Sequence, residues 1–349
     1  MATTEAKAWT YTNGYPQSLS LNTYKINQDD VKDNVLLKVE ACALNPVDIQ
    51  MMNTPIVWKY SSGPKGTVCD FSGSIVSPGK TSFKPGDEVM GLTLAPFARP
   101  TGGALSEYAE LDPSASVIVV KPKEWSFEKA AAIPLVWLTA VVCIDSVAPF
   151  VEKTSSKKVA ILGGSSSTGI YSILLAKRRG WNVVSTSSGR NKDFIINDLK
   201  ADAHVDYTTQ NVREGVSAFQ PDAVIDCVGG TECIGLPSSK RYTTIVGDKT
   251  GRLTMGGPFT YFDYKHPIVA ATQWMRWAKG RCVMGESYDV VILAPKKESL
   301  ERATSTLSEE HIFIDSVFPF EDAQKAFERL NTGRAKGKIV LRVGKESKL

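Results

Sequence analysis

The sequence has little of what builds metal lobes, disulfide frameworks or membrane spans. Its six cysteines are spread over 349 residues without a C-x-x-C pair, a pattern that predicts reduced thiols in a cell interior. No apolar run approaches the roughly 18 residues that cross a bilayer, so we expect no transmembrane segment. The residues around Glu5 form neither an apolar signal core nor an arginine-rich stretch, which disfavours secretion and a mitochondrial presequence.

A strong charge of either sign is also absent. The net charge is +4 and the basic residues are scattered, apart from Lys177, Arg178 and Arg179, which are typical of a last helical turn before Gly180. This balance favours neither nucleic acid nor an anionic membrane surface as a partner. The hydrophobic share of 42% and the charged share of 22% indicate a globular chain with a sizeable core, and the length favours two domains.

A strand, a turn of small residues and a helix follow one another between Lys157 and Gly180. The apolar run Lys158 to Leu162 ends at the turn GGSSSTG, which spans Gly163 to Gly169, and helix-spaced apolar residues follow. Small residues let the backbone approach a pyrophosphate, and the new helix directs the positive end of its dipole at the charge. The turn therefore predicts a dinucleotide site. Ser166 stands where a middle glycine is expected, so an ordinary strand-to-helix turn is the alternative.

The loop after the next strand indicates which dinucleotide binds. An NAD site places an acidic residue there to accept from the ribose hydroxyls. Trp181 to Thr186 is followed instead by Ser187, Ser188, Gly189, Arg190, Asn191 and Lys192. Hydroxyls and two cations suit a 2′-phosphate, which favours NADPH over NADH. A solvated basic loop, partly neutralised by Asp193, is the alternative.

The strand and helix patterns predict two domains that differ in secondary structure. Short strands and turns fill Lys7 to Lys121, which indicates an irregular β-rich domain. Alternating strands and helices follow, and they require a parallel sheet with right-handed crossovers. The expected strands are 159–162, 183–186, 204–206, 223–227 and 243–246, with a last parallel strand near Cys282. We expect residues 1–124 and 290–349 to form the β-rich domain and 125–289 the dinucleotide-binding domain, with the cofactor in a cleft between them.

The last three residues predict a cellular address. Ser347, Lys348 and Leu349 follow a polar stretch and match the peroxisomal signal that a soluble import receptor reads. We expect a peroxisomal protein on this basis, with the cytoplasm as the alternative.

Motifs throughout the chain resemble those of medium-chain dehydrogenase/reductases. They comprise NPVD at Asn45, DFSG at Asp70, FKPGDEV at Phe83, GALSEY at Gly103, the GGSSSTG turn, VDY at Val205, DCVGG at Asp226 and GRAKGKIVL at Gly333. The chain is most similar to the zinc-free quinone oxidoreductase branch, including its reticulon-interacting and fungal enoyl-reductase-like members. The resemblance implies an α/β fold, with a Rossmann doubly wound parallel sheet plus a β-rich GroES-like catalytic domain.

The resemblance also addresses the metal. Where zinc-dependent members have cysteine, histidine and a third ligand, this chain has Asn45, Cys69 and an apolar residue near Leu135. A catalytic zinc needs three protein ligands, and the stretch Val89 to Tyr108, where the four-cysteine lobe would lie, contains no cysteine. We therefore expect no metal. Without zinc, the acceptor must already be electrophilic, such as a quinone, an enone or an enoyl thioester.

Site residues follow from the resemblance position by position. Asn45 is expected beside the nicotinamide ribose and Thr139 near the pyrophosphate. The other expected cofactor contacts are Gly164, Ser165, Ser166, Ser167, Thr168, Ser187, Ser188, Arg190, Lys192, Tyr207, Cys227, Val228, Val246 and Gly247. Several quinone reductases place a tyrosine proton donor at the position of Gln50, so the catalytic candidates are Asn45 and, as a substitute donor, Tyr60. Asn45 as a turn former, and Cys227 and Val228 as plain core, are the alternatives.

These expectations favour an NADPH-dependent, zinc-independent reductase of quinones or activated double bonds. A non-catalytic NADPH-binding scaffold and an alcohol dehydrogenase are the alternatives. The aromatic segment Met255 to Lys279 includes Phe259, Tyr261, Phe262, Tyr264, Trp274 and Trp277. It either walls the acceptor site, covers a homodimer face, docks on a membrane or packs in the core.

Overall fold

The computed structural model describes residues 3–16, 19–27, 31–53, 63–248, 266–282 and 285–344. Within these ranges the chain forms two compact units, of which the first comprises 3–135 and 295–344 and the second 136–248 and 266–294. The sequence-based boundaries after residues 124 and 289 remain predictions. Tyr60, the residues 255–265 of the aromatic segment and the terminal Ser347, Lys348 and Leu349 lie outside the described residues.

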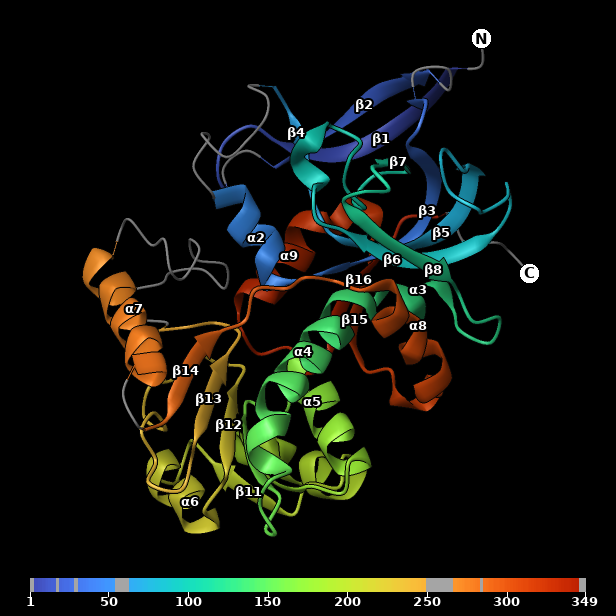
Figure 1. Ribbon diagram of the computed structural model, residues 1–349. Coiled ribbons are helices and arrows are strands. Elements are labelled where there is room, and N and C mark those ends of the chain that lie inside the picture. The colour runs from blue at the N-terminus through green and yellow to red at the C-terminus, as the bar shows by residue number, and fades with distance from the viewer. Residues whose placement is uncertain are drawn as a thin grey trace. The chain divides into compact units, whose positions relative to one another are not determined.

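The second unit is built on a parallel sheet with the strand order β11-β10-β9-β12-β13-β14 (Figure 1). Its strands are β9 (Lys158–Leu162), β10 (Asn182–Ser187), β11 (Ala203–Asp206), β12 (Ala223–Asp226), β13 (Arg241–Thr244) and β14 (Ser287–Val290). All five strand pairs are parallel. Counted along the chain, this order is that of a doubly wound dinucleotide-binding fold, with the reversal between β9 and β12. The predicted fold class is confirmed.

Helices cover both faces of this sheet. Adjacent residues of a strand point to opposite faces, and on β10 the side chain of Val184 packs in one cluster with Val216 of α6 (Val212–Phe219). The neighbouring Ser185 lies on the other face, where Ile173 of α5 (Ser167–Arg178) approaches the same glycine, Gly164. Strands buried on both faces read as continuous apolar runs, which is why KVAIL is recognisable in the sequence. Short helical turns at Gly189–Asn191 and Phe194–Asp198 follow β10.

The last parallel strand is not where the sequence places it. Cys282 ends α7 (Pro267–Cys282), and the strand follows as β14. Trp274 and Trp277, one helical turn apart, contact each other edge to face with ring centroids 5.7 Å apart. Arg281 covers Trp277 at 4.1 Å from the ring centroid. The mixture of apolar and basic residues thus belongs to a surface helix, and Trp274 remains 42% exposed.

The first unit contains two mainly antiparallel sheets. A seven-stranded sheet follows the order β15-β16-β3-β5-β6-β8, with β7 pairing β3. Its strands are β3 (Val35–Leu44), β5 (Asp70–Ser77), β6 (Glu88–Thr93), β7 (Tyr108–Leu111), β8 (Ser116–Val120), β15 (Ile314–Pro319) and β16 (Lys338–Arg342). A smaller sheet joins β1 (Thr3–Tyr11), β2 (Ser20–Asn27) and β4 (Lys65–Gly66). The helices are α2 (Pro46–Asn53), α3 (Phe127–Ala131), α8 (Lys297–Thr306) and α9 (Ala323–Asn331). The expected return of the chain end to this sheet is observed, since β16 pairs with β3.

Among the residues that the structure describes, one helical stretch is long and apolar enough to cross a membrane. It spans Phe127–Val151, which contains α3 and α4 (Pro134–Val151), and has a mean hydropathy of 2.0. No apolar run of this length was expected, and this stretch is the exception on length and composition. The protein fold itself buries 78% of the apolar window, as in the core helix of a compact domain.

Candidate cofactor-binding site

The turn between β9 and α5 brings three backbone segments into close contact. Gly163 has φ +81°, and its N–H donates to Thr186 Oγ1 at 2.9 Å, while the Gly164 N–H donates to the Thr186 carbonyl at 2.9 Å. A Cβ on Gly164 would lie 2.1 Å from Ser185 Oγ, and one on Gly169 would lie 2.2 Å from the Gly163 carbonyl oxygen. Only glycine fits these positions. The start of α5 is thereby held directly above the ends of β9 and β10, where a pyrophosphate would bind.

Ser166 is the N-cap of α5. Its hydroxyl accepts from the Gly169 N–H at 3.1 Å, and its backbone is extended, with φ −71° and ψ 154°. This is the geometry in which serine satisfies one of the free N–H groups at a helix start. The serine in place of a middle glycine is therefore explained by capping. Ser165 and Ser167 beside it are half-buried, and Thr168 is buried in the first turn.

The loop after β10 presents its cations to solvent. Arg190 and Lys192 are exposed, and among the described residues neither has an acidic partner at ion-pair distance. Ser188 is half-buried. Ser187 lies beneath the loop, because its hydroxyl is buried and donates to the Ser188 carbonyl at 3.0 Å. The exposed part of the predicted 2′-phosphate site thus consists of Ser188, Arg190 and Lys192.

A buried carboxylate, which sequence reasoning did not select, ties together two loops of the predicted site. Asp226 ends β12; its Oδ1 accepts from the N–H groups of Val228 and Gly229, each at 2.9 Å, and its Oδ2 accepts from Thr244 Oγ1 at 2.7 Å. Thr244 Oγ1 in turn accepts from the Gly247 N–H at 2.9 Å. Burial raises the pKa of Asp226 to about 6, against these hydrogen bonds. Its position directly before Cys227, in the motif DCVGG, is the signal that could have identified it.

The remaining predicted contacts of the second unit differ in exposure. Tyr207 is 59% exposed and Val228 is 38% exposed, so both side chains can meet a ligand. Cys227 is buried, and burial raises the pKa of its thiol well above the usual range, which keeps the sulfur neutral. Thr139 is buried in α4.

In the first unit, Asn45 belongs to a buried polar network. Its Oδ1 accepts from Lys338 Nζ at 2.6 Å, and its Nδ2 donates to Asp70 Oδ2 at 2.9 Å. Lys338 Nζ also lies 3.0 Å from Asp70 Oδ2, and this ion pair is closed to solvent. Both ends of the Asn45 amide are therefore engaged within the protein, which fixes its orientation. Lys338 and Asp70 are further residues that sequence reasoning missed.

A second buried carboxylate supports the same loop. Asp48 Oδ2 accepts from the Asn45 N–H at 2.7 Å, and Asp48 Oδ1 accepts from the Cys69 N–H at 3.0 Å. Burial raises the pKa of Asp48 to about 7, although the hydrogen bond from Asn45 opposes this shift. Burial likewise raises the pKa of the Cys69 thiol. Within the described ranges, no three histidine, cysteine or acidic side chains are grouped so that they could hold a metal ion.

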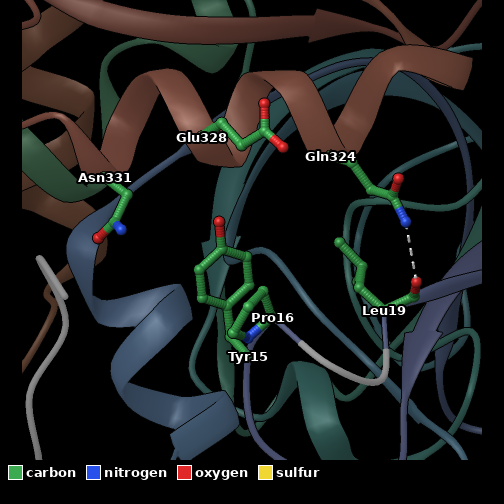
Figure 2. Close-up of a pocket in the computed structure, with 6 residues that line it drawn as sticks. All are labelled: Tyr15, Pro16, Leu19, Gln324, Glu328 and Asn331. Atoms are coloured by element: carbon green, nitrogen blue, oxygen red, sulfur yellow. Dashed lines mark hydrogen bonds between the residues drawn. The ribbon is translucent and has the colours of Figure 1, made fainter. Parts of the chain in front are cut away.

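A cavity of about 490 Å³ lies elsewhere in the first unit (Figure 2). It is lined by Tyr15, Pro16, Leu19, Gln324, Glu328 and Asn331, and Gln324 Nε2 donates to the Leu19 carbonyl at 3.3 Å. As Figure 2 shows, α9 supplies one wall and the segment before β2 supplies the other. None of the predicted site residues that the structure describes lines it.

Comparison with known proteins gives matches over both units. The family model of the alcohol dehydrogenase GroES-like domain matches residues 31–122, and that of zinc-binding dehydrogenase matches residues 199–341. Trans-enoyl reductase pgmF of Aspergillus terreus is 28% identical, over 97% of this chain and 96% of the relative. 2-Methylene-furan-3-one reductase of Solanum lycopersicum is 29% identical, over 97% of this chain and 79% of the relative. The solved quinone oxidoreductase from Coxiella burnetii has a TM-score of 0.73 at 26% identity, covering 98% of this chain and all of its own.

Proposed function

The chain is a medium-chain dehydrogenase/reductase of the quinone oxidoreductase-like branch, and from this membership we propose that it is an NADPH-dependent, zinc-independent reductase of quinones or α,β-unsaturated carbonyl or enoyl compounds. It is an oxidoreductase of a family that uses nicotinamide cofactors. Beyond this membership we propose that the protein prefers the phosphorylated cofactor, that it works without zinc and that its acceptors are of the classes named above.

The loop after β10 is the observation that supports NADPH. Ser188 stands where an acidic residue would accept from the ribose hydroxyls, and the cations of Arg190 and Lys192 are exposed beside it. Two acidic residues lie near this loop. Asp206 is already hydrogen-bonded, since its Oδ1 accepts from the Thr208 N–H at 2.9 Å and from Thr208 Oγ1 at 2.6 Å. Asp193 follows Lys192 in the chain and is exposed, so it offsets part of the positive charge and leaves a net charge of +1 on the loop. Two free cations beside a hydroxyl favour a phosphate dianion.

The Lys338 ammonium is the observation that supports a reaction without zinc. It donates a hydrogen bond to the side-chain oxygen of Asn45. Asn45 stands at the position of a cysteine ligand in zinc-dependent members. A metal ion at this place would face a buried positive charge with one carboxylate, Asp70, already paired to it. We infer that the network orients the Asn45 loop, while bound NADPH would supply the hydride for an acceptor that is already electrophilic.

Replacing Lys192 by alanine tests the cofactor assignment. We expect the dissociation constant of NADPH to rise by roughly tenfold, the effect of losing about 1.4 kcal/mol from one charge-assisted contact, with that of NADH almost unchanged. Lys153→Ala, which removes another exposed lysine of the same unit, is the matched control. An equal loss of NADH and NADPH affinity in Lys192→Ala would refute the 2′-phosphate site.

Turnover distinguishes the reductase from its alternatives. NADPH consumption is to be measured with quinones, enones and a 2-enoyl thioester, before and after treatment with a chelator. We expect activity with at least one of these classes and no effect of the chelator. Tight NADPH binding without any turnover would favour the scaffold alternative, and activity abolished by chelation would favour a zinc alcohol dehydrogenase.

A further inference from the structure

A histidine lies directly beneath the loop that would receive the 2′-phosphate. His204 is on β11, where it pairs with Ser185 of β10, and its side chain is half-buried. His204 Nε2 lies 2.8 Å from Ser187 Oγ. The single hydrogen of the Ser187 hydroxyl is directed at the Ser188 carbonyl. With that hydrogen engaged, we assign the contact as Nε2–H donating to the Ser187 oxygen, the tautomer in which Nδ1 is the nitrogen that can take up a proton.

We propose that His204 is a specificity-determining residue for the phosphorylated cofactor, and that its protonation adds a positive charge to the 2′-phosphate site and so couples the preference for NADPH over NADH to pH. This inference rests on the proposed function, because it requires the 2′-phosphate to bind at Ser188, Arg190 and Lys192. His204 would act from behind Ser187 and Ser188, as a positioning and charge-supplying residue without a role in hydride transfer.

The charges around His204 decide when it is protonated. Burial lowers the pKa of its imidazole, Asp206 on the same strand raises it, and Lys192 from the loop after β10 lowers it. The imidazole is therefore neutral near pH 7 in the free protein, since its ordinary pKa lies near 6.5. A phosphate dianion bound between Ser188 and Lys192 would raise this pKa. NADPH binding would then be accompanied by proton uptake, whereas NADH binding would not.

The cofactor phosphate titrates in the same pH range and must be separated from His204. A phosphate monoester has its second pKa near 6, so its own charge falls as the pH is lowered and binding weakens. Protonation of His204 has the opposite effect, because it strengthens binding. A neutral variant at position 204 retains the first effect and loses the second. His204→Gln serves this purpose, since the glutamine amide can still donate to Ser187 Oγ.

The test is equilibrium binding of NADPH and NADH to the full chain between pH 5.5 and 8, followed by intrinsic tryptophan fluorescence. At pH 6 we expect His204→Gln to bind NADPH three- to tenfold more weakly than the unmodified protein, the range for one partly screened charge. At pH 8 the two proteins should agree, and NADH binding should agree throughout, which also shows that the variant is folded. Calorimetry in buffers of different ionisation enthalpy should detect proton uptake with NADPH only in the unmodified protein. In His204→Lys, a permanent charge should keep NADPH binding tight at pH 8.

The outcomes separate this inference from the proposed function. If Lys192→Ala discriminates between the cofactors but His204→Gln changes neither the pH dependence nor the proton uptake, the role of His204 is refuted and the NADPH site stands. If His204→Gln weakens NADH and NADPH equally at all pH values, its role is structural and the inference is likewise refuted. If Lys192→Ala itself does not discriminate, both fail.

Discussion

The buried network around Asn45 depends on the side chain of Lys338, which contacts both Asn45 and Asp70. Replacing Lys338 by methionine would leave the Asn45 oxygen without its donor and would remove the cation from Asp70, in a site closed to solvent. The Asp70 carboxyl would keep only its hydrogen bonds from Asn45 Nδ2 and the Leu135 N–H. Breaking a buried ion pair by removing one partner costs about 3–5 kcal/mol, and protonation of Asp70, whose pKa burial already raises, would reduce this loss. We expect the free energy of unfolding in urea to fall by about 3 kcal/mol.

An exposed ion pair of the same unit provides the control for this change. Lys325 lies 2.8 Å from Asp322 at the start of α9, and both side chains reach solvent. Lys325→Ala should leave the urea midpoint unchanged, because exposed pairs contribute little. A similarly small effect of Lys338→Met would contradict the importance assigned to the network.

The raised pKa of the Asp48 carboxyl group makes the stability of the folded protein depend on pH. Burial raises its pKa from an ordinary value of 3.8 to about 7, so the folded protein holds this proton more tightly than the unfolded chain. Its contribution is therefore present at low pH and lost as the pH rises towards 7, by about 1 kcal/mol per pH unit. Between pH 6 and 7, urea unfolding should show a smaller loss of stability in Asp48→Asn than in the unmodified protein. Parallel pH profiles of the two proteins would show that Asp48 does not titrate in this window.

Single residues were predictable only where their neighbours in sequence identify them. Asn45 is recognisable as the first residue of the NPVD motif, but its partners Asp70 and Lys338 are 25 and 293 residues away. A lysine inside a strand is ordinarily an exposed residue, so nothing local indicates that Lys338 is buried. The capping role of Ser166 is a local property that sequence reasoning left open between phosphate binding and turn packing.

At the scale of elements, the turn Gly163 to Gly169 and α5 are in such close contact that we expect one added methyl group to weaken cofactor binding strongly. In Gly169→Ala the new Cβ would lie 2.2 Å from the Gly163 carbonyl oxygen and 2.9 Å from the Gly164 Cα, and neither backbone atom can move independently of the turn. We expect α5 to shift away from the turn and both NADPH and NADH to bind at least roughly tenfold more weakly, because the pyrophosphate is common to both. Gly63→Ala is the control, since no atom lies within 4 Å of its Cβ position. Unchanged cofactor binding in Gly169→Ala would contradict the tight packing of this turn.

Strands and helices were predicted well where a single hydrophobic pattern dominates the segment. Apolar runs located β9 and β12, since strands buried on both faces are continuously apolar. β10, β11 and β13 contain polar residues, and the predicted strand 243–246 lies two residues beyond the observed β13. The last parallel strand failed because α7 and β14 are joined within a few residues and both contain apolar and charged side chains. The helix there exposes Ile268, Trp274 and Met275, so its apolar residues do not mark a buried face.

At the scale of the whole molecule, the strand order follows from the chain order of the elements and a simple topological rule. Right-handed crossovers after β9 place β10 and then β11 on one side, and the remaining strands fill the other side from β12 to β14. The mixed, mainly antiparallel sheet of the first unit could not be ordered in this way. Its β15 and β16 come from the chain end and pair beside β3, over a separation that no local pattern encodes.

The cellular location is a property of the whole chain, and we propose that the ending Ser347, Lys348, Leu349 directs it to the peroxisome. A fluorescent protein fused to the amino terminus leaves this ending free. In eukaryotic cells the fusion should coincide with a peroxisomal marker, and deletion of the last three residues should move it to the cytoplasm. Lys345→Ala removes a neighbouring positive charge but keeps the tripeptide, so it should leave the location unchanged. If the deleted protein still coincides with the marker, the tripeptide is not the address. If the full chain stays in the cytoplasm, quinones and enones are favoured as substrates over the enoyl thioesters of the peroxisomal matrix.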